Sequence, residues 1–469
     1  MSRISEIQQE VEELEEERQQ EQNQQFNEGL ISLLTQKDQE ILSLKDQITQ
    51  MENSLKHLMN DLHKSENVRK HMHNHIQILK GNIRVFCRVK PLTASKTGEL
   101  ELRKSSMNQN VIQIANPPSS SIKEFPTTLE LTTESNQVIA DKSGNAKLYH
   151  FDCVFPPQTM QEEIFQEVKP FIQSAIDGEN VCIFAYGQTG AGKTFTMEGP
   201  PYLFINEEDS ADVSELAGIL PRCGRFLFSE LKRLQHTQTT CEISSLEVYC
   251  DQVRDLYSPD QHSDLQLISV KNKVVIQGQT WKKVANPAEF DKYLRLSTSK
   301  RVFSNNGVNE RSSRSHHIFQ VKFTSNNKES LLNIIDLAGS ERRGDMMKNT
   351  KPTQVLSQSK SIMNNSKGNI GQSKPKNKQE VALQVLESES VSINKSLTTL
   401  GRIFMMIADR KAKVKQMPPY RESKLTRILQ DSLSYETKTL MIVNVCSGSE
   451  NAQQTKESLN FASQAMLAY

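Results

Sequence analysis

The run from Gly187 to Thr194, Gly-Gln-Thr-Gly-Ala-Gly-Lys-Thr, has the residue types and spacing that suit the binding of nucleotide phosphates. It fits the pattern Gly-x-x-x-x-Gly-Lys-Ser/Thr, in which a glycine-rich backbone turns its amide groups around the phosphates. In this pattern Lys193 reaches the β- and γ-phosphate oxygens, and the Thr194 hydroxyl ligates Mg2+. Taken alone, the run has two interpretations, a phosphate loop or a chance glycine-rich turn.

The residues on either side of this run favour the phosphate loop. Residues 181–186 form an apolar stretch of buried-strand length, and residues 194–197 can begin a helix whose N-terminus faces the anion. A strand, a loop and a helix in that order are the context in which the motif works. We therefore expect a nucleoside triphosphate as the ligand.

Two polar runs further along the chain could sense the γ-phosphate. Residues 332–339 read as a strand that ends in Asp-x-x-Gly, where the Asp336 carboxylate can hold the Mg2+ shell and the Gly339 amide can bond the γ-phosphate. The run 309–316, Asn-Glu-Arg-Ser-Ser-Arg-Ser-His, offers hydroxyls for Mg2+ and a guanidinium for an ion pair. Each run is a weak signal alone, because Asp-x-x-Gly is common and the other run could be a polar loop. With the glycine-rich run they form a consistent set.

At this set of motifs the sequence resembles the kinesin motor domain. The matching stretches are spread over nearly all of residues 83–467. They are Phe-Asp-Cys-Val-Phe at 151–155, the glycine-rich run with its strand at 184–194, the polar run at 309–316, Asp-Leu-Ala-Gly-Ser-Glu-Arg at 336–342, Ile-Asn-Lys-Ser-Leu at 393–397, and Pro-Tyr-Arg-Glu-Ser-Lys-Leu-Thr at 419–426. The resemblance implies an α/β fold of the P-loop NTPase class, with a central, mostly β sheet flanked by helices. It also implies an ATP hydrolase that microtubules stimulate.

The junction at residues 79–91, Leu-Lys-Gly-Asn-Ile-Arg-Val-Phe-Cys-Arg-Val-Lys-Pro, resembles that of the C-terminal-motor class, because a coiled coil precedes it and the motor follows it. This resemblance implies movement toward microtubule minus ends, with ATP hydrolysis coupled to a swing of the helical neck near residues 70–82. The alternative is a non-motile structural subunit that binds microtubules through a kinesin fold. Such a subunit would be expected to have lost some of the chemical residues, and this chain keeps them.

The resemblance also implies roles for individual residues. Ser313 would close on Mg2+ and the γ-phosphate, and Gly339 would sense that phosphate. Arg314 and Glu341 would form the ion pair that closes the two switches and positions the attacking water. The expected cofactors are ATP and Mg2+. The adenine ligands would be Arg88, Pro91 and Phe195; the phosphate ligands Gln188, Thr189, Gly190, Ala191, Gly192, Lys193 and Thr194; the Mg2+ ligands, partly through water, Thr194, Ser313 and Asp336; and the tubulin contacts Arg421, Lys424 and Arg427.

Among the departures of the chain from the family are two that lie near these sites. Lys90 stands where the family usually has arginine, and a lysine cannot repeat a bidentate contact. Residues 345–386 are far longer than the loop that usually follows the second switch, and we expect a basic, flexible insertion there. Residues 346–385 contain seven lysines and one glutamate, which gives this segment a net charge of +6. These lysines either add attraction to the acidic surface of tubulin or only keep the insertion solvated.

The first part of the chain predicts a coiled coil. From residue 41 to residue 79, apolar side chains recur at alternating steps of three and four, and only Ser65 and Arg69 interrupt the seam. An earlier seam at residues 4–14 has a different phase, so a break is expected near residues 18–25. The alternative is one amphipathic helix packed on its own domain. We favour pairing, as a homodimer or a heterodimer.

Composition agrees with this division into a coiled-coil stalk and neck at residues 1–80 and a motor domain at 81–469. The hydrophobic content of 36% is low for a wholly globular chain. The seven cysteines form no Cys-x-x-Cys pair, which suits reduced thiols. The start lacks the apolar core of a signal peptide, and there is no apolar run of membrane-spanning length. We expect a cytoplasmic protein of the microtubule cytoskeleton, the spindle included, with no nucleic-acid partner and no membrane insertion.

Overall fold

The computed structural model describes residues 2–91, 112–115, 125–131, 148–200, 214–234, 239–260, 264–271, 273–303, 313–325, 328–341, 378–408, 417–434, 437–448 and 451–466. The chain divides into two compact units, Met1–His75 and Ile76–Tyr469. The second unit holds the sheet and all the predicted site residues. Within the described residues, no helix has the length and apolar character that crossing a membrane requires.

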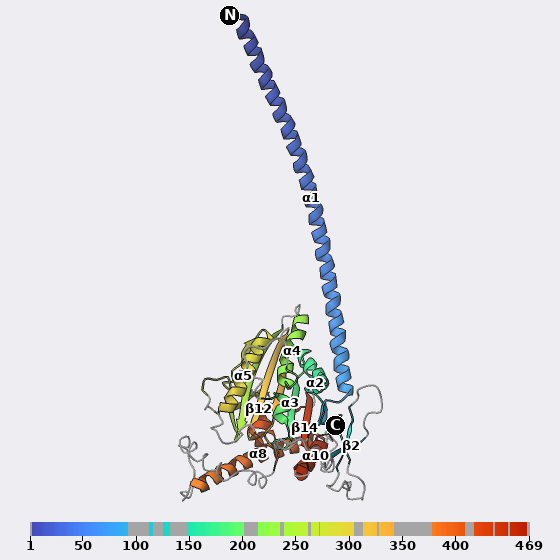
Figure 1. Ribbon diagram of the computed structural model, residues 1–469, viewed down its shortest axis with the longest axis vertical. Helices are drawn as coiled ribbons and strands as arrows, with labels where there is room; N and C mark the ends of the chain where they lie inside the picture. The colour runs from blue at the N-terminus through green and yellow to red at the C-terminus, as the bar shows by residue number, and fades with distance from the viewer. Residues whose placement is uncertain are drawn as a thin grey trace, which may run out of the picture. The chain divides into compact units, whose positions relative to one another are not determined.

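The first unit consists of most of one helix, α1, which runs from Ser2 to Leu79 (Figure 1). The break expected near residues 18–25 is absent, and that expectation was wrong. This segment is almost entirely glutamine, glutamate and arginine, all good helix formers, so the seam can change phase while the backbone stays helical. The seam side chains are exposed, with Ile48 at 55% and Leu58 at 65%, as expected for one strand of a coiled coil.

The second unit is built on a mixed sheet with the strand order β11-β7-β12-β13-β6-β14-β1-β5, in which β8 pairs with β7. The strands β13, β6, β14, β1 and β5 run parallel to one another, whereas β12 pairs antiparallel with both β13 and β7. The bounds are β1 Ile83–Lys90, β5 Cys153–Phe155, β6 Val181–Tyr186, β7 Thr240–Tyr249, β8 Gln252–Asp255, β11 Lys282–Val284, β12 His316–Ser325, β13 Lys328–Asp336 and β14 Lys438–Cys446.

Two small sheets accompany the central one. One has the order β2-β3-β4, and the other pairs β9 with β10. Their bounds are β2 Ile112–Ala115, β3 Thr128–Leu131, β4 Leu148–His150, β9 Leu267–Val270 and β10 Lys273–Ile276.

Helices cover both faces of the central sheet (Figure 1). The strand β6 shows this arrangement, because its side chains alternate between two cores: Cys182 and Phe184 lie in one, Val181 and Ile183 in the other. All of β6 is buried, as expected for a central parallel strand between two helical layers. On the first core pack α8 Lys378–Ala408, η4 Tyr420–Glu422, α9 Lys424–Ile428, η5 Asp431–Leu433 and α10 Ala452–Met466; on the second pack α2 Gln161–Ile176, α3 Lys193–Met197, α4 Ile219–Arg233 and α5 Pro287–Phe303. The predicted fold class is confirmed.

We predicted a flexible insertion at residues 345–386, and the C-terminal boundary of that prediction is wrong, because α8 begins at Lys378. Residues 378–386, Lys-Gln-Glu-Val-Ala-Leu-Gln-Val-Leu, consist mostly of good helix formers, which continue the helix toward its N-terminus. The remainder of the predicted insertion, residues 345–377, lies outside the described residues.

The end of α1 that belongs to the second unit is fastened to the sheet through Arg84 of β1. The Arg84 guanidinium donates a hydrogen bond to the side-chain oxygen of Gln77, in the last turns of α1. The same guanidinium lies 3.9 Å from the centre of the Phe171 ring on α2, a cation–π contact. Gln77 and Arg84 are both buried, so these contacts are shielded from water and hold the helix end in place.

Candidate nucleotide site

The glycine-rich run forms the loop between β6 and α3. Gly187 has a φ of +143°, and a Cβ placed there would lie 2.2 Å from the carbonyl oxygen of Asn444 on β14. Gly192 caps the N-terminus of α3 with a φ of +96°. Only glycine adopts these conformations at little cost. The loop therefore takes the shape that turns backbone amides toward an anion.

Lys193 is folded back onto this loop. Its ammonium donates to the carbonyl oxygens of Gly187 and Gln188, each at 2.9 Å. The side chain is buried, and burial lowers the Lys193 pKa, while the nearby carboxylates of Asp336 and Glu341 act in the opposite direction. A cation held at the loop by carbonyl oxygens suits a phosphate, which would supply negative charge in direct contact.

Thr194 and Asp336 form the part of the site that could hold Mg2+. The parallel pairing of β13 with β6 sets Asp336 opposite Ala185, and the Thr194 hydroxyl donates to Asp336 Oδ2 at 2.6 Å. Asp336 is buried, and its Oδ1 has no hydrogen-bond partner within the described part of the chain. Oxygen ligands of this kind fit Mg2+, which binds through few protein carboxylates and keeps phosphate and water ligands. The described residues hold no cluster of three or more His, Cys, Asp or Glu side chains that could bind a metal.

The two predicted switches meet beside the loop. The Gly339 amide donates to the carbonyl oxygen of Ser313 at 2.8 Å, which joins the second switch to the first. The Ser340 amide donates to the carbonyl oxygen of Gly187 at 3.1 Å, which joins the second switch to the phosphate loop. The structure therefore brings together three motifs that lie far apart in the sequence.

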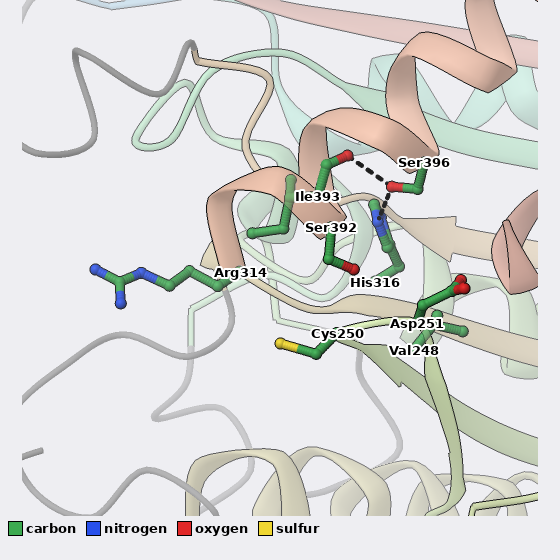
Figure 2. Close-up of a pocket in the computed structure, with 8 residues that line it drawn as sticks. All are labelled: Val248, Cys250, Asp251, Arg314, His316, Ser392, Ile393 and Ser396. Atoms are coloured by element: carbon green, nitrogen blue, oxygen red, sulfur yellow. Dashed lines mark hydrogen bonds between the residues drawn. The ribbon is translucent and has the colours of Figure 1, made fainter. Parts of the chain in front are cut away.

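The predicted ion pair between Arg314 and Glu341 is not formed in this structure. Both carboxylate oxygens of Glu341 instead accept hydrogen bonds from Thr189, one from its amide at 2.9 Å and one from its hydroxyl at 2.5 Å. The Arg314 guanidinium points away from the other residues labelled in Figure 2. The pairing of Arg314 with Glu341 stays a prediction for the nucleotide-bound protein.

The predicted adenine residues lie at the end of β1 and at the start of α3. Arg88 donates to the side-chain oxygens of Gln161, at 2.9 Å, and Thr196, at 2.8 Å, and its guanidinium carbon lies 5.2 Å from the centre of the Phe195 ring. Burial lowers the Arg88 pKa to about 10. Pro91, just after β1, is exposed. A fixed cation beside an aromatic ring leaves a planar surface on which a base could stack.

Two contacts near this surface were not predicted from the sequence. Gln161 also donates to the backbone oxygen of Phe195 at 2.6 Å, so it orients both Arg88 and the ring. A buried glutamine at the start of a helix has no sequence signal, because glutamine is usually exposed. Lys90 donates to the carbonyl oxygen of Gly190 at 2.7 Å, so the lysine that replaces the usual arginine still contacts the loop, through one bond.

A buried ionic cluster behind the switches was also missed. Arg301 on α5 donates to Glu198 Oε1 at 2.7 Å and lies 3.5 Å from Asp336 Oδ2, and His317 Nδ1 lies 3.1 Å from the same Glu198 oxygen. Burial alone would raise the pKa of Glu198, but Arg301 and His317 outweigh it and lower the pKa to about 2. Because these residues are isolated in the sequence, nothing in the local pattern pointed to their assembly.

The three predicted tubulin contacts differ in their surroundings. Arg421, in η4, is exposed, and Arg427, in α9, is half-buried. The Lys424 ammonium contacts both carboxylate oxygens of Asp264, at 2.7 and 2.6 Å. The charge of Lys424 is therefore already neutralised within the chain.

A sequence profile of the kinesin motor domain matches residues 88–366 and 370–467 of the chain. The chain is 34% identical over 411 residues to carboxy-terminal kinesin 2 of Xenopus laevis, a match that covers 83% of this chain and 54% of that protein. It is 33% identical over 411 residues to kinesin-like protein KIFC1 of Homo sapiens, a match that covers 83% of this chain and 53% of that protein. The chain thus spans about half the length of these relatives.

A solved structure described as the C-terminal motor and motor homology domain of Kar3Vik1 fused to a synthetic heterodimeric coiled coil is similar in fold. The TM-score is 0.65 and the sequence identity 28%, over 93% of this chain and 99% of that chain.

Proposed function

This chain belongs to the kinesin motor domain family, and we propose that it is a microtubule-stimulated ATPase motor. The observation that carries the proposal is the convergence of the phosphate loop with both switches, through the bonds of Gly187, Ser313 and Gly339. Phosphoryl transfer depends mostly on positioning and charge neutralisation, and these groups are suited to supply both. ATP is the proposed substrate and Mg2+ the proposed metal.

The proposed roles of individual residues are those that the resemblance implies, and the contacts of Lys193, Thr194 and Asp336 support theirs. Lys193 and the loop amides would bind the β- and γ-phosphates, while Thr194 and Asp336 would hold Mg2+, which neutralises charge on the phosphates when it is bound. Ser313 would join them when the first switch closes. The remaining proposed roles are those of Arg314 and Glu341, which would pair to position the attacking water.

We propose that the motor moves toward microtubule minus ends and drives a swing of the neck at the end of α1. The similarity to carboxy-terminal kinesin 2 and to a solved C-terminal motor supports the C-terminal-motor class, from which the proposed direction follows. The exposed apolar seam of α1 supports a coiled-coil dimer, and a homodimer and a heterodimer are both compatible with it. The place of action would be the cytoplasmic microtubule cytoskeleton.

Phosphate release with and without microtubules tests the proposed activity. The wild-type chain should release phosphate slowly alone and at least about tenfold faster with microtubules, an expectation set by the role of partner-supplied groups in phosphoryl transfer. Lys193→Ala should abolish both rates, whereas Lys232→Ala, at an exposed lysine of α4, should change neither. A wild-type rate that microtubules leave unchanged would refute the motor and favour the non-motile subunit. Gliding of polarity-marked microtubules tests the direction, and plus-end movement would contradict it.

A further inference from the structure

His316, the first residue of β12, connects the second switch to α8, and Figure 2 shows its contact with α8. The Ala338 amide donates to His316 Nδ1 at 3.0 Å. On the other side of the ring, His316 Nε2 lies 2.9 Å from the hydroxyl oxygen of Ser396 on α8. The Ser396 hydroxyl in turn donates to the carbonyl oxygen of Ile393 at 2.7 Å. The four groups form a continuous relay, with His316 and Ser396 both buried.

The direction of each bond in this relay is determined by chemistry. An amide can only donate, so His316 Nδ1 must be the acceptor and the ring proton must lie on Nε2. Nε2–H then donates to Ser396, which has its own proton engaged with Ile393. The ring is neutral, because burial and the charge of Lys193 lower the His316 pKa to about 3. Only one arrangement of protons satisfies all four groups. The hydrogen bonds of the relay therefore hold Ala338, His316 and Ser396 in fixed positions relative to one another.

The two ends of the relay lie in segments with different tasks. Ala338 lies between Asp336 and Gly339, the residues proposed to hold Mg2+ and to sense the γ-phosphate. Ser396 lies in α8, and further along that helix Arg402 donates to Glu422 of η4 at 2.7 Å. A shift of Ala338 therefore reaches, through His316 and α8, the turn that carries the proposed tubulin contact at residue 421.

A small pocket lies beside His316 and Ser396, and its other lining residues are Val248, Cys250, Asp251, Arg314, Ser392 and Ile393 (Figure 2). These come from β7 and the turn after it, from the first switch and from α8. The relay therefore lies where the first switch, β7 and α8 meet.

We infer that His316 is a positioning residue whose bonds to Ala338 and Ser396 transmit the effect of microtubule binding to the second switch. This inference rests on the proposed function, since it assigns a route to microtubule stimulation. His316 touches neither the proposed phosphate site nor the proposed metal site, and it acts through the backbone of the switch. Its removal should change stimulation more than basal turnover.

Ser396→Ala is the first test, because it removes the hydroxyl that bonds to His316 and Ile393 and leaves the bond between Ala338 and His316 in place. Of the two bonds that are lost, only the one to His316 joins α8 to β12. Basal phosphate release should stay within about twofold of wild type, and the maximal microtubule-stimulated rate should fall by about three- to tenfold, the range that one hydrogen bond supplies. The microtubule concentration at half stimulation should change little. Ser392→Ala is the matched control, since Ser392 lies on the same helix beside the same pocket and outside the relay; its rates should equal those of wild type.

His316→Asn breaks the same relay from the other side, because the shorter side chain can still accept from Ala338 but cannot reach Ser396. It should reproduce the Ser396→Ala phenotype, and the double variant should be no worse than either single variant. A Ser396→Ala protein with full stimulation would overturn the inference while the proposed function stands. Equal losses in the basal and stimulated rates would also overturn it, since they indicate a merely structural role. A wild-type chain without stimulation would instead refute the proposed function.

Discussion

The carboxylate of Glu341 is held by Thr189, through the Thr189 amide at 2.9 Å and its hydroxyl at 2.5 Å. Glu341 is buried in this position. The contact ties the second switch to the phosphate loop and occupies both oxygens that Arg314 would need. The proposed pairing with Arg314 would bring a guanidinium to a carboxylate that Thr189 already holds, so the two contacts would compete.

Thr189→Ala should raise the basal rate of ATP turnover by about three- to tenfold, because the hydroxyl bond that competes with closure is lost while the amide bond remains. Single-turnover phosphate release without microtubules measures this rate. Thr189→Ser keeps a hydroxyl and serves as the control, with the wild-type rate expected. A lower or unchanged rate for Thr189→Ala would show that the contact does not restrain closure.

Asp336→Asn should reduce ATP turnover by at least about 100-fold, because a metal ligand contributes several kcal/mol of charge stabilisation in such reactions. The reduced rate should recover only in part when the Mg2+ concentration is raised. Asp260→Asn, at an exposed carboxylate, is the control and should behave as wild type. Equal Mg2+ dependence in the wild-type and Asp336→Asn proteins would remove Asp336 from the metal site.

Arg421→Ala should weaken microtubule binding more than Lys424→Ala does. Arg421 is exposed, whereas Lys424 is paired with Asp264 and presents little net charge. Co-sedimentation with microtubules over a range of salt concentrations measures the difference, and Arg421→Ala should also flatten the salt dependence. A larger loss for Lys424→Ala would mean that the lysine leaves Asp264 to bind tubulin.

Acid should destabilise the wild-type motor unit more steeply than it destabilises His316→Asn. The folded protein holds the His316 pKa at about 3, below the ordinary value of 6.5, because the ring is buried and Lys193 repels its charged form. Between these two values the unfolded chain binds a proton that the folded chain excludes, so stability falls as the pH falls, by up to about 1.4 kcal/mol per pH unit. Urea unfolding at several pH values, from neutral down to the middle of this window, measures both slopes. Parallel profiles would show that His316 is not held neutral.

Gly224→Ala should destabilise the motor unit. A Cβ at Gly224 in α4 would lie 2.5 Å from a ring carbon of Phe290, which is fully buried. Overpacking of this kind costs about 1–3 kcal/mol, against about 1 kcal/mol gained in helix propensity. Gly29→Ala is the matched control, because Gly29 lies in α1 and a Cβ added there would have nothing within 4 Å. Thermal unfolding of the full chain should show the motor transition at a lower temperature for Gly224→Ala and at the wild-type temperature for Gly29→Ala.

The phosphate loop and the strand before it could be predicted because their information is local. A buried strand reads as an apolar run, and the loop after it needs glycine at 187 for steric reasons. The partner of Glu341 could not be predicted, since the family motif describes the closed switches and the chain can also satisfy this carboxylate with Thr189. The ion pair of Glu198 with Arg301 could not be predicted for a different reason. The two residues are about a hundred positions apart, belong to no common sequence motif and meet only in the folded chain.

Helix boundaries were the weakest part of the prediction. The change of seam phase near residues 18–25 suggested a break, although the residues themselves favour a helix. The start of α8 at Lys378 was missed because the residues before 378 are polar, whereas five of the nine residues 378–386 are apolar and most are good helix formers. In both segments intrinsic helix propensity indicated the helix better than the surrounding pattern did.

The strand β1 carries a contact with the neck at one end and contacts with the nucleotide site at the other. Arg84 binds Gln77 of α1, while Arg88 and Lys90 bind Thr196 and Gly190 beside the phosphate loop. These ends are about 20 Å apart at the usual rise of a strand. β1 pairs with β14 along its whole length and with β5 at residues 86–88, which makes it a stiff element. The proposed neck swing would then have a short route from the nucleotide site, along β1 and across residues 80–82 to the end of α1, where the Arg84–Gln77 bond bridges the connection.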